Sequence, residues 1–150
     1  MALQKSSIGA IIALSATGII LTLAASGLLF STQNVQYNGN VSAVNVGVYT
    51  DSDCTNNCTH ITAGTVSPGM SYTDVIYVKN TGNEPVTLSM TTSDWDPSAA
   101  NGPITLTWNR DSYTLDAGDS VRATLTLSIS SSISNSITAF SFNVAITGAG

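Results

Sequence analysis

Charged side chains are scarce in this 150-residue chain. They make up 9% of the residues, against about 25% in an average soluble protein. Four Lys and Arg residues are outnumbered by nine Asp and Glu residues, which gives a net charge of −5. So few cations form no basic patch that could neutralise phosphates, which excludes nucleic-acid binding. Because 43% of the residues are hydrophobic, we expect a packed core under a Ser-, Thr- and Asn-rich surface rather than a disordered chain.

The chain also lacks the motifs of catalytic sites. It has one histidine, and it contains no nucleophile elbow, glycine-rich phosphate loop or HExxH zinc motif. Asp94 and Asp96 flank Trp95, but alternate residues in a loop need not converge on one point. We therefore predict that the protein is not an enzyme and uses no metal or cofactor.

Cysteine is limited to Cys54 and Cys58, in the segment DSDCTNNC. A gap of three residues in a turn-rich loop can close a small disulfide ring. An exported protein would favour that bond, because its surroundings are oxidising. We predict a Cys54–Cys58 disulfide, with two thiols and a zinc half-site as the alternatives.

The longest apolar stretch runs from Ile8 to Phe30 and carries no charge. As a helix of 23 residues, it would span roughly 35 Å at about 1.5 Å per residue. A bilayer core is about 30 Å thick. The short segment before it has one positive side chain, Lys5, as in export signals and N-terminal anchors. Residues 1–30 are therefore predicted to be a signal peptide or a hydrophobic N-terminal helix.

This apolar segment has three possible fates. Small residues before Gly27 fit cleavage by a signal peptidase between Ser26 and Gly27. Lys5 and the two serines after it resemble a prepilin cleavage site, and cleavage near Ser6 would leave the hydrophobic helix on the mature protein. The third fate is an uncut membrane anchor. The protein is thus expected to meet a membrane only through residues 8–30, before cleavage or assembly.

Residues 31–40 are polar and predicted to be a linker or a mobile strand that pairs with a sheet edge. They contain the turn dipeptide Asn38-Gly39. Two positions fit the N-x-S/T acceptor pattern for glycans, Asn40 and Asn57. Glycosylation there is expected only if the chain is exported.

Residues 41–150 are predicted to form one β-domain. Apolar and polar side chains alternate in short runs, most clearly from Val121 to Ser130. Turn residues separate the runs, as in Ser67-Pro68-Gly69. The pattern is typical of an antiparallel β-sandwich of seven to eight strands. The main runs are Val41–Thr50, His60–Val66, Ser71–Asn80, Val86–Thr92, Ile104–Trp108, Val121–Ser130 and Thr138–Thr147.

A family resemblance adds to this prediction. Residues 65–97, TVSPGMSYTDVIYVKNTGNEPVTLSMTTSDWDP, order a PG turn, a strand, an NTGN loop with a proline, and a second strand. The chain resembles small exported immunoglobulin-like domains, in particular TasA/camelysin-like filament proteins and their archaeal relatives. Residues 28–51, LLFSTQNVQYNGNVSAVNVGVYTD, are similar to the N-terminal segment and first core strand of that family.

The resemblance implies an extracellular, cell-surface filament built by donor-strand complementation. In such filaments the mature N-terminal segment of one subunit fills an open sheet edge of the next, so the partners are copies of the same chain and the export machinery. Carried onto this sequence, the donor is Gly27–Tyr37. Its candidate strand residues are Leu28, Leu29, Phe30, Val35 and Tyr37.

The chain departs from TasA in being much shorter and nearly free of Lys, and its apolar segment is longer than a signal requires. These differences keep open a resemblance to archaeal type IV pilins, with residues 8–30 as a helical filament core. Another alternative is a membrane-anchored surface module that binds glycan or protein through Trp95 or Tyr72. For Trp95 itself, we favour a role in filling the core over an exposed contact.

Overall fold

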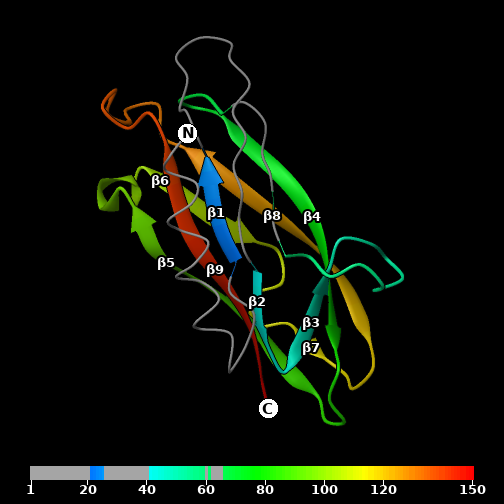
Figure 1. Cartoon of the computed structure of the whole chain (residues 1–150). Coiled ribbons are helices and arrows are strands. Elements are labelled where there is room, and N and C mark those ends of the chain that lie inside the picture. Colours follow the sequence, from blue (N-terminus) through cyan, green and yellow to red (C-terminus); the bar gives the residue numbers. More distant parts are fainter. Residues whose placement is uncertain (1–20, 26–40, 60, 62–65) are drawn as a thin grey trace.

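The computed structural model describes residues 21–25, 41–59, 61 and 66–150. In these residues it contains nine β-strands, one short 3-10 helix and no α-helix. Figure 1 shows the strands, labelled in chain order. The elements are β1 (Leu21–Ala25), β2 (Val41–Val44), β3 (Val46–Tyr49), β4 (Ser71–Asn80), β5 (Val86–Asp96), η1 (Ser98–Ala100), β6 (Ile104–Trp108), β7 (Thr114–Leu115), β8 (Ser120–Ile129) and β9 (Phe140–Ala149).

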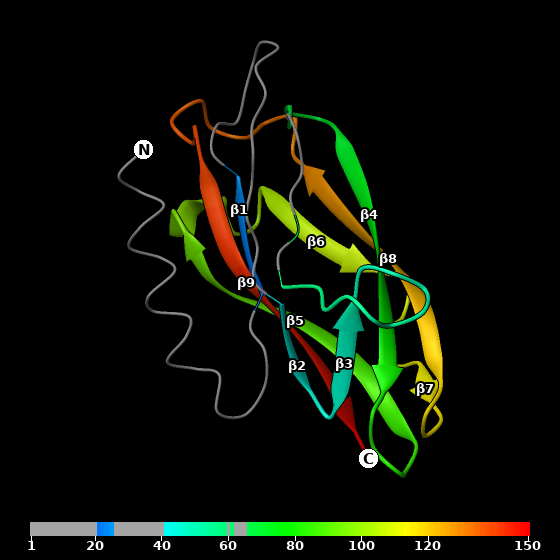
Figure 2. The same ribbon diagram turned by 45° about the vertical axis from the view of Figure 1, so that its right-hand side comes forward.

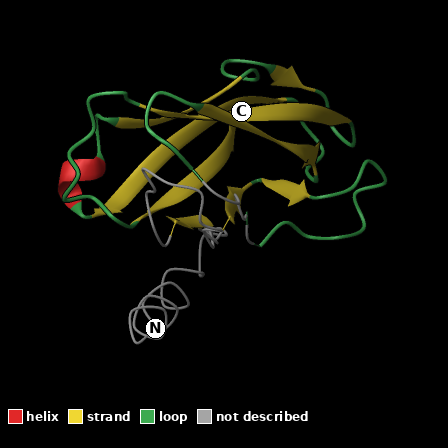
Figure 3. Ribbon diagram, turned by 90° about the horizontal axis from the view of Figure 1, so that it is seen from above, coloured by secondary structure: helices red, strands yellow, loops and turns green. Residues whose placement is uncertain are grey.

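The strands form two sheets around one hydrophobic core. In the first sheet β9 lies between β5 and β1, β7 pairs with β5, and β2 also pairs with β9. The second sheet has the order β3, β4, β8, β6 (Figure 2). Neighbouring strands are antiparallel, except that β2 runs parallel to β9. The prediction of an all-β sandwich is confirmed at this level, and Figure 3 shows the short helix η1 at one end of the domain.

The core follows from the alternation of apolar residues. In β8, Ala123, Leu125, Leu127 and Ile129 are buried, while the residues between them point outward and are partly exposed. A strand places successive side chains on opposite faces, so this period of two buries one face of β8 and leaves the other in contact with solvent. β8 pairs with the whole of β4 from Ser71 to Lys79, which joins the two longest strands of this sheet.

The predicted strand Val41–Thr50 is interrupted at Asn45. This residue has a φ of 62°, in the left-handed region that asparagine tolerates better than most residues. Its amide group donates a hydrogen bond to the carbonyl oxygen of Gly148 at 3.1 Å. Before Asn45 the chain pairs with β9 as β2, and after it the chain pairs with β4 as β3. The segment therefore belongs to both sheets.

The predicted turn at Ser67-Pro68-Gly69 and the turn before β8 each contain a glycine with a positive φ. Gly69 has a φ of 77°, and the N–H of Met70 donates to the carbonyl oxygen of Ser67 at 3.3 Å. Gly118 has a φ of 80° in the turn before β8. Glycine adopts positive φ without steric cost, which explains its place at both turns.

Asn80 fixes the NTGN loop between β4 and β5. Its side chain is fully buried, with an exposed fraction of 0%. Its amide nitrogen donates to the carbonyl oxygens of Glu84 (2.7 Å) and Leu115 (3.0 Å), and its amide oxygen accepts from the N–H of Gly82 (2.9 Å). The same residue therefore organises the hairpin loop and ties it to β7.

The N-terminal apolar segment differs from the predicted helix where the structure describes it. Leu21–Ala25 is a β-strand rather than part of a helix. It pairs with β9 over five residue positions, so the backbone hydrogen-bonding groups that face β9 have partners in the sheet. The remainder of residues 8–30 lies outside the described part of the chain.

Candidate strand-acceptor edge

One long edge of β9 is covered by residues from the N-terminal region. On its other side β9 pairs with β5, from Thr87 opposite Ala149 to Ser93 opposite Asn143. On the covered edge, β1 takes positions 140–144 and β2 takes positions 144–147. Leu21 and Val41 share Val144 as their partner, so the two strands meet there. Figure 1 shows β1 alongside β9.

The strand at this edge is among the most deeply buried of the fold. Phe140, Phe142, Val144 and Ile146 have exposed fractions between 0% and 3%. The register sets Leu21, Leu23 and Ala25 opposite three of them, in the order Val144, Phe142 and Phe140. An antiparallel strand with apolar residues at every second position therefore suits this edge.

A β-bulge in β5 supports β9 from the opposite side. The register of the β5–β9 pair shifts between Ser93 and Asp96, and Asp94 within it has a φ of 53°. The extra residue changes which side chains face the core. As a result Trp95, which follows the exposed Asp94, stacks on Phe142.

Trp95 is held at this position by two kinds of contact. Its ring lies 3.9 Å from that of Phe142, centroid to centroid, with 17° between the planes. Its indole N–H donates to the hydroxyl oxygen of Thr92 at 3.2 Å. The prediction that Trp95 fills the core is confirmed by this packing, although the residue lies at the end of β5 and not in the expected loop.

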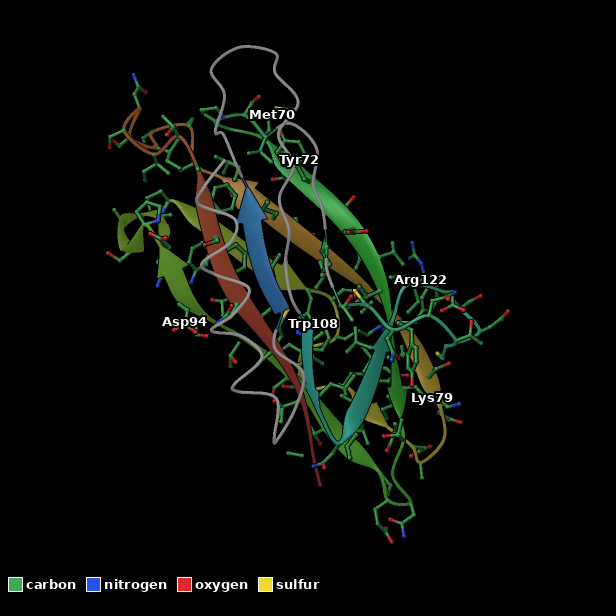
Figure 4. All side chains as sticks on the ribbon, viewed as in Figure 1. Met70, Tyr72, Lys79, Asp94, Trp108 and Arg122 are labelled. Carbon is green, nitrogen blue, oxygen red and sulfur yellow. The ribbon has the colours of Figure 1, made fainter. Side chains whose placement is uncertain are left out.

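The outward face of β9 carries one buried polar residue, Asn143, with an exposed fraction of 6%. Its side-chain amide donates a short hydrogen bond to the carboxylate of Asp94, at 2.5 Å. The bulge thus places a carboxylate against β9 where a regular strand would place a different residue. Figure 4 shows Asp94 on the side of the domain away from Lys79 and Arg122.

The cleavage residues Ser26 and Gly27, the donor Gly27–Tyr37 with its five strand residues, and the glycan acceptor Asn40 all lie outside the described residues. The second acceptor, Asn57, is exposed, so its side chain is accessible to a modifying enzyme. These assignments stay predictions.

The loop with the two cysteines follows β3. Cys58 is buried, with an exposed fraction of 1%, and Cys54 is partly exposed. The structure gives both residues as thiols, and the predicted disulfide between them stays a prediction. Burial raises the pKa of Cys58 from an ordinary 9.0 to about 12, and the carboxylate of Asp74 adds to the rise. The thiol form of Cys58 is therefore strongly favoured.

Asp51 organises the start of the same loop. Its carboxylate accepts hydrogen bonds from the hydroxyl of Thr55 (2.6 Å) and the N–H of Asn56 (2.8 Å). These two bonds lower the pKa of Asp51, the hydroxyl bond most, because they stabilise the charged carboxylate. The carboxylate thus stabilises the conformation of its own loop through these hydrogen bonds.

No group of three or more His, Cys, Asp or Glu side chains in the described part of the chain could hold a metal ion. Among the described residues, no helix has the length and hydropathy to cross a membrane.

A scan against protein-family models finds no match for the chain, and a search of curated proteins finds none either. The resemblance to TasA/camelysin-like proteins therefore stays a prediction, carried by residues 28–51 and 65–97.

Sequence reasoning missed β1. The alternation Leu21-Thr22-Leu23 is a strand signal, but it is only three residues long. It also lies within an uninterrupted apolar run, where helix and strand periods cannot be told apart. Its partner strand lies more than a hundred residues away in the sequence, and no local pattern reveals such a pairing.

Proposed function

We propose that the protein is a structural subunit of an extracellular surface filament, with an immunoglobulin-like sandwich as its body. Copies of the chain assemble by donor-strand complementation. The N-terminal segment of one mature subunit fills a sheet edge of the next. The export machinery delivers the chain, and no catalytic step is involved.

The observation that carries this proposal is the pairing of β9 with an N-terminal apolar strand. The edge from Phe140 to Val144 takes a strand from before the domain rather than a neighbour from within it. An uncovered strand edge presents unpaired N–H and C=O groups, which template the addition of another strand. Main-chain hydrogen bonds then give affinity, and alternate side chains set the register.

The chemistry of the candidate donor matches this edge. The donor Gly27–Tyr37 contains no charged residue, so its transfer from water to a sheet edge carries no charge-desolvation cost. Leu28 and Phe30 are two residues apart, as are Val35 and Tyr37. Each pair can therefore lie on one face of a strand, and in a regular strand Leu28 and Phe30 lie on the face opposite to Val35 and Tyr37. The pair Leu28 and Phe30 is the one placed against β9 in this proposal. The buried row Phe140, Phe142 and Val144 offers apolar partners at the same spacing.

The proposal is tested on the native, exported protein. Mass spectrometry of filaments purified from the surface is expected to find Gly27 as the first residue. In full-length chains, replacing Leu28 and Phe30 with Lys is expected to abolish filaments in negative-stain electron microscopy, because two charges would enter the row opposite β9. The matched control replaces Ser31 and Gln33 with Lys, and we expect it to keep assembly.

Normal filaments from the Leu28/Phe30 variant would contradict donor-strand assembly through this segment. A first residue at Ser7 or Ile8 would instead favour the pilin-like alternative, in which residues 8–30 stay on the mature chain. Monomers alone on the native cell surface would contradict the filament function itself.

A further inference from the structure

We infer that Leu21–Ala25 is a removable cap on the edge of β9: it fills this edge in the unprocessed chain, and cleavage after Ser26 opens the edge to a strand of another copy. The inference concerns the regulation of the acceptor edge and rests on the proposed function for the identity of the strand that follows. The cap is β1, and the capped edge is Phe140–Val144.

β1 fits the edge of β9 along its whole length. β1 pairs with β9 at five consecutive positions without a register shift. The residues opposite Leu21, Leu23 and Ala25 are core residues with exposed fractions of 3% or less. A strand in this register closes the edge against addition of a further strand, as covered edges do in other sheets.

The cap ends next to the predicted cleavage site. Ala25, the last residue of β1, comes directly before Ser26. A signal peptidase uses water to hydrolyse the peptide bond between Ser26 and Gly27, which leaves a carboxylate on Ser26 and an amine on Gly27. β1 then belongs to the leader peptide, whereas β2 remains with the domain.

Cleavage weakens the binding of β1 to β9. In the uncut chain, residues 26–40 connect β1 to β2. Because both strands belong to one chain, β1 meets β9 at an effective concentration on the order of millimolar. Cleavage removes that connection, and the leader must then hold the edge as a separate peptide with five paired positions. Association of separate molecules carries an additional entropic cost, so the cap leaves.

After cleavage, the domain keeps β2 and gains a new N-terminal segment. β2 still covers β9 from Val144 to Thr147, so the opened gap is confined to Phe140–Asn143. The new N-terminal segment, residues 27–40, has 14 residues and can extend to about 46 Å or slightly more. The gap of four residues on β9 would span about 13 Å as a strand, which is well below this length.

The test uses the full chain in detergent, with the recognition sequence of a site-specific protease inserted between Ser26 and Gly27. Hydrogen exchange measured by mass spectrometry follows the amides of Phe140–Val144 before and after cutting. We expect the amides of this stretch that face β1 to exchange at least about tenfold faster on cutting, because they lose the protecting strand, whereas the amides that face β5 stay protected. Filaments should appear only in the cut sample.

Two substitutions in the uncut chain sharpen the test. Leu23→Lys places a charge opposite Phe142, which is fully buried, whereas the matched control Ala24→Lys lies opposite Ser141, which is partly exposed. We expect Leu23→Lys to speed exchange at Phe140–Val144 and to permit assembly without cutting. The control should do neither. Slow exchange in β8 verifies that each variant is folded.

The outcomes separate the cap from the filament function. Unchanged exchange at Phe140–Val144 after cutting, or equal assembly of cut and uncut chains, would overturn the cap. Faster exchange without filaments would support the cap and contradict the proposed function. Filaments in which cross-linking places β1 of one chain on β9 of another would also overturn the cap, because β1 would then be the exchanged strand.

Discussion

The indole of Trp95 lies nearly parallel to the ring of Phe142, with 3.9 Å between their centroids. Phe142 also lies near Phe140, 6.3 Å between centroids, so three aromatic rings line the end of the core beneath the acceptor edge. The bulge at Ser93–Asp96 is what allows Trp95 to join them. Packing of β5 and the geometry of the acceptor edge are therefore linked through one aromatic contact.

Replacing Trp95 with Ala is expected to lower the free energy of unfolding by about 2–3 kcal/mol. This is less than the roughly 3–5 kcal/mol for a fully buried Trp, because Trp95 is only partly buried. Urea unfolding followed by circular dichroism measures the change. The control Thr91→Ala removes an exposed side chain of the same strand and should change stability little. Equal midpoints for Trp95→Ala and the control would contradict the role of Trp95 in the core.

Replacing Asn80 with Ala is expected to destabilise the domain by about 3 kcal/mol, because three side-chain hydrogen bonds are lost and each is worth roughly 1 kcal/mol. The carbonyl oxygens of Glu84 and Leu115 and the N–H of Gly82 would lose their side-chain partner. Asn83→Ala, an exposed change in the same loop, is the control. If both variants unfold at the same urea concentration, Asn80 does not hold the hairpin as described.

The raised pKa of Cys58 predicts a pH dependence in the reduced protein. Between pH 9 and 12 the unfolded chain loses the thiol proton that the folded chain keeps. The unfolded state then binds fewer protons, so the free energy of unfolding falls as pH rises through this range and is unaffected below it. Urea unfolding at several pH values measures the slope. Cys58→Ala should flatten it, and an equal slope in both proteins would contradict the prediction.

Labelling separates the two cysteines by accessibility. At mildly alkaline pH, iodoacetamide is expected to modify Cys54 in the folded, reduced protein and to spare Cys58, because the thiolate is the reactive form. Mass spectrometry of digested protein reads both positions, and urea-denatured protein provides full labelling. Absence of labelling at both positions in native, exported protein would instead indicate the predicted disulfide.

The lowered pKa of Asp51 predicts that its carboxylate stays charged to unusually low pH. Its contribution to stability is present above the ordinary aspartate value and is lost as pH falls through the folded pKa. Thr55→Val removes the largest cause of the shift and is expected to raise the pKa, as followed by NMR of the carboxyl carbon. Thr59→Val, an exposed control in the same loop, should leave it unchanged. No rise in Thr55→Val would contradict the assigned cause.

Local pattern was sufficient to predict much of the fold. β8 and β4 were predicted because their apolar residues alternate with Ser, Thr and charged residues, and the Gly69 turn because proline and glycine restrict the backbone there. Asn45 illustrates what pattern does not contain. Valines alternate from Val44 to Val48 as in one strand, but the amide of Asn45 bonds to Gly148, over a hundred residues away. Only the packed sheets decide that the strand changes partner.

The candidate site was less predictable for the same reason. The apolar character of Leu21–Ala25 was evident, but its register on β9 depends on long-range pairing with Phe140–Val144. The bulge around Asp94 was also hidden, because nothing in the sequence SDWD fixes where an extra residue enters the ladder. The sequence shows that Leu21–Ala25 is apolar, but only the folded structure shows that this segment pairs with Phe140–Val144.

The switch at Asn45 has a mechanical consequence. Tension applied to the N-terminal side of the domain enters through β2, which is parallel to β9 over Val41–Val44. If the opposing pull acts at the Ala149 end of β9, the two strands are loaded along their length, in shear, and their hydrogen bonds must fail together instead of one after another. Past Asn45, the same backbone carries the remaining load into the second sheet through β3 and β4. A single asparagine thus makes both layers share a tensile force.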